Sequence, residues 1–132
     1  MHTFDVSTRQ RNEFVEITAE VRQAVRAGGV KQGWCVVYCP HTTAAITINE
    51  NADPDVVHDM LLWFDRTIPK EQRGFQHGEG NSDSHIKASL VGSSATVLIE
   101  AGDLVLGRWQ GVYFCEFDGP RRRTVHVQIL GK

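Results

Sequence analysis

The stretch from residue 109 to 130, WQGVYFCEFDGPRRRTVHVQIL, constrains the fold of this chain more than any other segment. It contains two runs in which apolar and polar side chains alternate, which is the pattern of half-buried strands. The DGPR segment between the two runs is typical of a tight turn. We therefore predict an antiparallel hairpin. On its first strand, alternation places Val112 and Phe114 on one face and Tyr113 and Cys115 on the other.

Similar patterns predict further strands along the chain. These strands are expected at TFDVS and EFVEI within residues 3–17, and at GWCVVYC (33–39), TAAITINE (43–50), ATVLIE (95–100) and LVLG (104–107). On the last strand of the chain, Val125, Val127 and Ile129 face inward, so His126 faces the other way.

Amphipathic patterns predict three short helices. The first begins at Thr18, which we interpret as its N-cap, and stops at the glycine pair 28–29. The second begins at Asp53-Pro54, ends near Arg66 and buries a stripe of five apolar residues: Val56, Val57, Met60, Leu61 and Phe64. The third spans about 83–91. Without regular βαβ alternation, the chain is predicted to be α+β, with a mainly antiparallel sheet and two or three short helices, as a single domain over residues 1–132.

The composition is that of an ordinary globular domain, with 132 residues of which 41% are hydrophobic and 23% charged. A formal net charge of −2 provides no basic field to recruit nucleic acid or an anionic membrane. No apolar run approaches the roughly 20 residues needed to span a bilayer, and the first ten residues lack the apolar stretch of a signal peptide. We therefore expect a cytoplasmic protein with no nucleic-acid or membrane partner.

The chain has three cysteines, an odd number that argues against a closed disulfide framework. Cys35 and Cys39 share a face of one predicted strand but lie about 13 Å apart, too far to bind one ion. We expect all three to be small buried apolar residues.

Four polar segments interrupt the apolar pattern, and the first runs over residues 41–51. Thr42 and Thr43 follow His41 at a turn, and hydroxyls beside exposed backbone N–H groups suit an anionic oxygen such as that of a phosphate. The alternative is a turn whose side chains satisfy their own backbone. Asn49 and Glu50 end the strand that follows.

The second segment offers imidazole and oxygen ligands within nine residues: His77, Glu79, Asn81, Asp83 and His85. Two glycines let this segment curl, so His77 on the loop and His85 on the first turn of the helix can converge. Imidazole nitrogen with carboxylate or amide oxygen suits zinc, or manganese and magnesium where oxygens dominate. The alternative is a solvated loop before an N-capped helix.

The third segment centres on Glu116, flanked by Phe114, Cys115 and Phe117. Desolvation there is expected to raise the carboxyl pKa, which suits a general base or a metal ligand. The alternative is a surface-facing glutamate on a half-exposed strand.

The fourth segment is the arginine run 121–123 at the predicted hairpin turn. The guanidinium fork suits phosphate and pyrophosphate, so the run is an anion site or, alternatively, a solvated turn. Three arginines form too small a footprint for duplex nucleic acid.

Three ordered blocks carry a family resemblance: HTTAAITINENADPDV, HGEGNSDSHIKASLVG and GRWQGVYFCEFDGPRRRTVHVQI. Together they resemble the YjbQ-type family, also called secondary thiamine-phosphate synthase, from about Phe4 to Ile129. One departure is Arg108, where the family pattern has a small residue, often threonine, before Trp109 and Gln110. The resemblance implies a compact α+β domain that assembles as a homotrimer, with histidines binding a divalent metal in a pocket near the subunit boundary.

The resemblance also implies a weak thiamine-phosphate synthase activity, which joins hydroxymethylpyrimidine diphosphate to thiazole phosphate and releases pyrophosphate. The rival interpretations are a protein that binds a metal or a phosphorylated metabolite without turnover, and a metal that only stabilises the trimer. The residues expected to act are these: metal ligands His77, His85, His41 and Asn81; catalytic residues Glu116, Glu50, Arg121 and Arg123; and substrate-binding residues Thr42, Thr43, Asn49, Trp109 and Gln110. We also expect the nearly isosteric Glu116→Gln substitution to lower synthesis with little loss of thermal stability.

Overall fold

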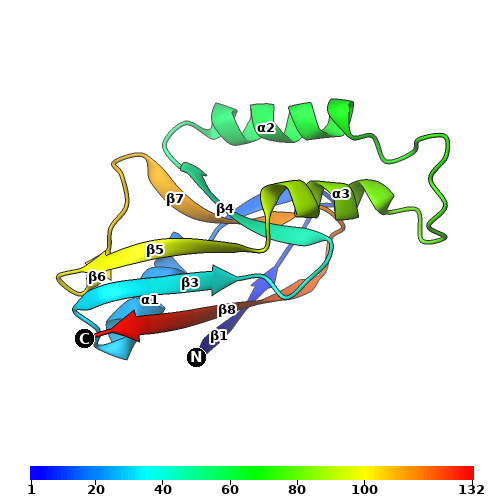
Figure 1. Cartoon of the computed structure of the whole chain (residues 1–132). Coiled ribbons are helices and arrows are strands. Elements are labelled where there is room, and N and C mark those ends of the chain that lie inside the picture. Colours follow the sequence, from blue (N-terminus) through cyan, green and yellow to red (C-terminus); the bar gives the residue numbers. More distant parts are fainter.

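The chain forms two antiparallel sheets and three helices, and the computed structural model describes all residues 1–132 (Figure 1). The elements in chain order are β1 (His2–Ser7), β2 (Glu13–Glu16), α1 (Thr18–Gly28), β3 (Gln32–Tyr38), β4 (Ala44–Glu50), α2 (Pro54–Thr67), α3 (Ser82–Val91), β5 (Ser94–Glu100), β6 (Asp103–Leu104), β7 (Gln110–Glu116) and β8 (Arg122–Gly131). One sheet has the strand order β1-β8-β3-β5-β6, and the other has β2-β7-β4. The predicted α+β class with antiparallel pairing is confirmed.

The main core lies between the two sheets and is closed by α1. It includes Val112 and Phe114 from β7, Val125 and Val127 from β8, and Val25 from α1, all with 0% exposure. The inward positions predicted for β8 are confirmed at Val125 and Val127, while Ile129 is half-buried. On β7 both predicted faces are buried, since Val112 and Phe114 face this core and Tyr113 and Cys115 belong to a smaller apolar cluster. Helix α1 contacts β6, β7 and β8, so it packs against strands of both sheets.

The predicted hairpin between the last two long strands is wrong. β7 pairs with β2 and β4, whereas β8 pairs with β1 and β3, so the two strands belong to different sheets. Their apolar faces meet across the core instead of lying side by side. This arrangement buries both inward faces against each other, which is the usual way for two sheets to remove apolar surface from water. The turn at 117–121 thus carries the chain from one sheet to the other.

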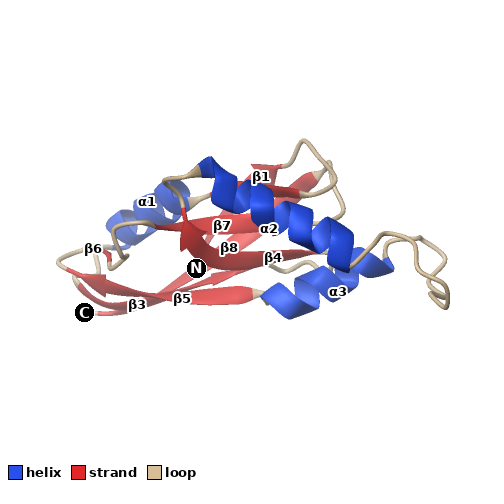
Figure 2. Cartoon of the chain, turned by 90° about the horizontal axis from the view of Figure 1, so that it is seen from above, coloured by secondary structure: helices blue, strands red, loops and turns tan.

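Helix α2 begins as predicted but is less buried than expected. Asp53 caps it by accepting a hydrogen bond from the backbone N–H of Asp55 at 2.9 Å. The five residues of its apolar stripe are each only half-buried, and no residue of α2 is fully buried. Only Val57 and Phe64 pack against a second apolar cluster, which is formed by Ala45, Ala88, Tyr113, Cys115 and Phe117. Helix α2 crosses over the three-stranded sheet, and α3 lies along the β4 side of that sheet (Figure 2).

Three smaller expectations are also decided. Thr18 was expected to be the N-cap of α1, but the N-cap is Ile17. The hydroxyl of Thr18 does not cap the helix, because it donates to Glu16 and accepts the N–H of Val112. The strand expected at 104–107 is only the two-residue β6. All three cysteines are free and buried, and burial raises the pKa of the Cys39 thiol to about 11. None of the helices is long and apolar enough to cross a bilayer.

Candidate functional site

A polar pocket of about 430 Å³ opens where the segment before β4, the loop before α3 and the β7–β8 turn converge. No hydrophobic side chain lines it. Its lining residues are Pro40, His41, Thr42, Thr43, His77, Glu79, Asn81, His85, Asp118, Arg121 and Arg123. The fold therefore brings the first, second and fourth polar segments of the sequence to one place. A neighbouring hollow shares His41, Thr42 and His85 with the pocket.

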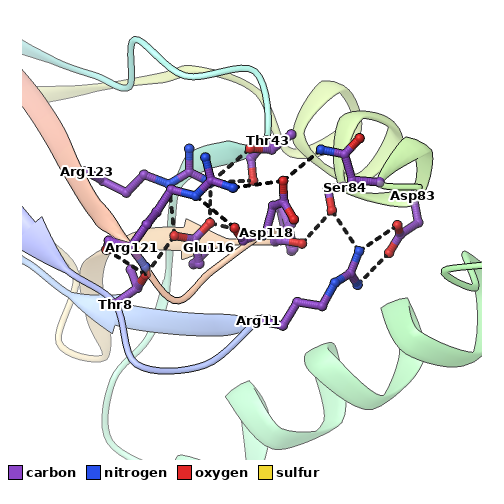
Figure 3. A network of polar contacts seen from close by, with 11 residues as sticks. Thr8, Arg11, Thr43, Asp83, Ser84, Glu116, Asp118, Arg121 and Arg123 are labelled. Atoms are coloured by element: carbon purple, nitrogen blue, oxygen red, sulfur yellow. Dashed lines mark hydrogen bonds and ion pairs between the residues drawn. The ribbon is translucent and has the colours of Figure 1, made fainter. Parts of the chain in front are cut away.

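Arg123, which lines the pocket, forms a buried ion pair with Glu116 (Figure 3). Glu116 is 0% exposed and Arg123 is 3% exposed. Both Nε and Nη2 of Arg123 donate to the carboxylate, and Nη2 also donates to Thr43 Oγ1 at 2.9 Å. The carboxylate additionally accepts from Thr8 Oγ1 at 2.8 Å and from the backbone N–H of Asp118 at 3.0 Å. Both carboxylate oxygens are therefore occupied by donors from within the chain.

This pairing makes Glu116 a weaker base than the sequence suggested. Burial by itself would raise the pKa of Glu116, but hydrogen bonds from Arg123 and Thr8 outweigh it and leave the pKa below its ordinary value. The expected raised pKa is wrong because the compensating arginine comes from β8, on the other sheet. Glu116 is also not a surface-facing residue, which was the alternative interpretation.

His41 lines the pocket with its ring oriented by two contacts. Its Nε2 accepts the backbone N–H of Thr124 at 2.9 Å, and the edge of the ring meets Phe114, with ring centroids 6.5 Å apart. Burial lowers the pKa of His41, and the positive charge of Arg123 acts in the same direction. Both effects disfavour the protonated imidazole.

His77 and His85 come together as the sequence predicted. Their rings are 5.4 Å apart between centroids and nearly perpendicular, at 83°. Asn81 lies between them in sequence and is 6% exposed; its Nδ2 donates to Asp118 Oδ2 at 2.7 Å. The Oδ1 atom of Asn81 is the one buried side-chain polar atom without a hydrogen-bond partner. No group of three or more His, Cys, Asp or Glu side chains is arranged to hold a metal ion.

Helix α3, which carries His85, is held by a charged network that the sequence analysis missed. Asp83 is 0% exposed and accepts two hydrogen bonds of 3.0 Å from Arg11 (Figure 3). It also accepts one of 2.9 Å from Lys87. Burial would raise the pKa of Asp83, but these donors lower it below its ordinary value. Asp83 is thus committed to anchoring the helix and does not line the pocket. The four-residue spacing of Asp83 and Lys87 on one helix was the available signal.

Several predicted site residues do not line this pocket. Asn49, Glu50, Trp109 and Gln110 lie at the other end of β4 and β7. In the register of these strands Ala44 pairs with Glu116, and Glu50 pairs with Gln110. Six residues of strand separate the two ends, about 20 Å. Three of the four use their side-chain oxygens on nearby backbone N–H groups: Asn49 on Glu50, Glu50 on Asp53 and Gln110 on Gly107.

Comparison with known proteins gives consistent matches over nearly the whole chain. Residues 2–132 match the family described as YjbQ, UPF0047 protein YjbQ-like. The chain is 50% identical to the UPF0047 protein YugU of Bacillus subtilis over 131 residues, which cover 99% of each protein.

Two solved structures have the same fold. An uncharacterized conserved protein of the YjbQ/UPF0047 family from Clostridium acetobutylicum has a TM-score of 0.96 and 53% identity, covering 98% of this chain and 100% of that one. A YbjQ-like protein of unknown function from Sulfolobus solfataricus has a TM-score of 0.93 and 34% identity, covering 99% and 96%. The comparisons establish family and fold, and the descriptions of these relatives assign no function.

Proposed function

Because the chain belongs to the YjbQ-like UPF0047 family, we propose that it binds a divalent metal ion together with a phosphorylated small molecule in the pocket around His77 and His85. The observation that carries the proposal is the unpartnered Oδ1 of Asn81. A buried carbonyl oxygen without a partner is costly, and a bound cation would satisfy it.

The two imidazoles fit one ion. Imidazole nitrogens bind zinc at about 2.0–2.1 Å, so two rings on one tetrahedral ion have centres roughly 5 Å apart. The observed separation is 5.4 Å. Two nitrogen ligands favour zinc or manganese over magnesium. His77, His85 and Asn81 supply at most three ligands, so at least one tetrahedral position is left for water or for an oxygen of the bound molecule.

Other residues that line the pocket suit a phosphate. Arg121 and Arg123 supply positive charge, and the exposed hydroxyl of Thr42 makes no hydrogen bond within the chain. Arg121 is held toward Asp118 by its Nε and Nη2, which donate at 2.9 and 3.1 Å. Guanidinium groups orient phosphate oxygens by paired hydrogen bonds, so these residues would fix the anionic end of a ligand.

The reaction we propose for this site is the synthesis of thiamine phosphate. In it, the lone pair of the thiazole nitrogen attacks the methylene carbon of the pyrimidine diphosphate, the carbon–oxygen bond breaks and pyrophosphate leaves. No proton needs to be removed, so the low basicity of the paired Glu116 carboxylate is no obstacle. The bound metal would supply charge at the departing pyrophosphate. Arg121 and Arg123 would orient that group and stabilise its developing negative charge.

The second candidate function is binding of the same ligand without turnover. It is favoured by the state of the two carboxylates expected to be catalytic. Glu116 is paired with Arg123, and Glu50 lies at the far end of β4. In this case the pocket would hold the metal and the phosphorylated ligand without a chemical step.

We further propose that the chain assembles as a homotrimer. The outer face of the five-stranded sheet is not covered by any helix and carries Trp34, Leu98 and Leu130, which are 41%, 60% and 44% exposed. Trp34 is in register with both leucines, so the three side chains form one apolar patch across β3, β5 and β8. Burying such a patch in a second copy would remove apolar surface from water.

Metal binding is tested by isothermal titration of zinc and of manganese into the chelator-treated protein. His77→Ala and His85→Ala should each weaken binding at least tenfold, because each removes one of the few ligands. His58→Ala is the matched control, since His58 lies on α2 and its side chain is 71% exposed beside Asp59. Equal affinity in all four proteins would refute the metal site.

Turnover separates the two candidate functions. The protein is supplied with hydroxymethylpyrimidine diphosphate, thiazole phosphate and the metal that binds, and thiamine phosphate is measured. Formation of product that is lost in His77→Ala supports the synthase. Binding of either precursor without product supports the second candidate.

A further inference from the structure

The hydrogen bond between His41 and β8 determines the chemical character of His41. A backbone N–H only donates, so Nε2, which receives the N–H of Thr124 at 2.9 Å, must carry its lone pair. In the neutral imidazole the proton then resides on Nδ1. If Nε2 were also protonated, its N–H would point at the backbone N–H of Thr124, and two donors would meet without an acceptor. The backbone of β8 therefore selects one tautomer of this histidine.

This tautomer has no lone pair to offer a metal. Nε2 is already occupied by the amide, and Nδ1 carries hydrogen, whereas metals bind unprotonated nitrogen. The Nδ1–H has no acceptor within the chain, although His41 lines the pocket. In this respect His41 differs from His77 and His85, whose ring nitrogens make no hydrogen bond within the chain and stay available to an ion.

A second free donor lies in the same pocket. Arg123 uses Nε and Nη2 on Glu116 and Thr43, which leaves Nη1 without a hydrogen bond inside the chain. The ion pair with Glu116 fixes the plane of the guanidinium group and therefore the direction of Nη1. Arg123 is only 3% exposed, so its side chain has little room to move.

We infer that His41 is a hydrogen-bond donor to an anionic oxygen and not a metal ligand, and that with Nη1 of Arg123 it forms an oxyanion subsite facing the metal-binding half of the pocket. The inference deepens the proposed function and rests on it for the metal. Three polar atoms of these residues make no hydrogen bond within the chain: Nδ1 of His41 and Nη1 of Arg123 are donors, and the buried Oδ1 of Asn81 is an acceptor. A phosphate would accept hydrogen bonds from the two donors. Its oxygens would also bind the metal ion, and that ion would satisfy Oδ1 of Asn81. In this arrangement Glu116 is a positioning residue for Arg123.

The test is nitrogen NMR on protein labelled at its histidines, using zinc alone, inorganic phosphate alone, and phosphate added to the zinc-loaded protein. His41 should show hydrogen on Nδ1 and an unprotonated Nε2 before any addition. Zinc should shift ring nitrogens of His77 and His85 and leave those of His41 in place, and phosphate should then shift Nδ1 of His41. Hydrogen on Nε2, a zinc response of His41 like that of the other two, or an unmoved Nδ1 at saturating phosphate would overturn the inference.

The two proposals fail separately. If zinc shifts none of the histidine nitrogen signals, the metal part of the proposed function fails. The tautomer of His41 and its response to phosphate alone still decide whether His41 is a donor to an anion. Affinities provide the second readout. His41→Leu should weaken phosphate binding about tenfold or more and change zinc affinity less than twofold. His41→Gln, which can accept the Thr124 N–H and still donate, should retain most of the phosphate affinity and guards against a folding defect. A large loss of zinc affinity in His41→Gln would also overturn the inference.

Discussion

Replacing Glu116 by glutamine should destabilise the protein strongly, contrary to what the sequence alone suggested. The carboxylate is 0% exposed and accepts hydrogen bonds from Thr8, the Asp118 amide and two nitrogens of Arg123. A neutral amide cannot accept all four, and it leaves the guanidinium of Arg123, only 3% exposed, without its counter-charge. Breaking a buried pair from one side costs about 3–5 kcal/mol. For a chain of this size that lowers Tm by roughly 10–20 °C.

The assay is urea unfolding followed by tryptophan fluorescence, at one fixed protein concentration because association would shift the midpoint. The matched control is Glu13→Gln. Glu13 is the cross-strand neighbour of Glu116 on β2, but it is half-exposed and accepts only the backbone N–H of Arg9, at 2.8 Å. We expect the control to cost no more than about 1 kcal/mol.

The double variant Glu116→Gln with Arg123→Met should be less destabilised than the sum of the single variants, because it leaves no unpaired charge. A loss in Glu116→Gln no larger than in the Glu13 control would refute the buried-pair argument.

The same pair predicts a pH dependence. The pKa of Glu116 is lower in the folded chain than in the unfolded chain, so the unfolded state binds its proton first as the pH falls. The pair therefore contributes its full stability above the ordinary carboxyl pKa of about 4.3 and loses it as the pH falls through the lower folded value. The stability gap between the parent and Glu116→Gln should be constant near neutrality and shrink on acidification. A difference in stability between the two proteins that widens below pH 4 would contradict the predicted direction of the pH dependence.

Three further predictions test other parts of the molecule. Asp83→Asn should lower the free energy of unfolding by about 3–5 kcal/mol, because it breaks the buried contacts that anchor α3. The control is Asp103→Asn in a surface ion pair, which should cost less than about 1 kcal/mol in the same urea assay. Arg121→Ala should lower phosphate affinity by calorimetry about tenfold, and Arg122→Ala, paired with Asp5 outside the pocket, should not; equal effects would remove Arg121 from the site. Leu98→Lys should convert a trimer into monomers in sedimentation equilibrium, and a parent that is already monomeric would refute the assembly.

The local patterns of the sequence were sufficient to locate most of the helices and strands and to group the side chains of a strand by face. Alternation with period two decides which side chains of a strand share a face: it placed Val112 with Phe114 on β7, and it correctly predicted the inward positions of Val125 and Val127 on β8. The Asp53-Pro54 pair likewise marked the start of α2, because capping depends only on the first turn. The spacing of His77 and His85 predicted their convergence, since a short loop joins them.

Only the tertiary structure decided which strand lies beside which and which charge meets which. The same alternation is compatible with a hairpin and with two strands facing each other across a core, and the choice depends on the strands that occupy the edges of β7 and β8. The Thr124 amide that selects the tautomer of His41 is 83 residues away from it, and Arg11 meets Asp83 over a separation of 72 residues. Local periodicity specifies the face of a side chain but not its partner, because partners are set by the packing of whole sheets.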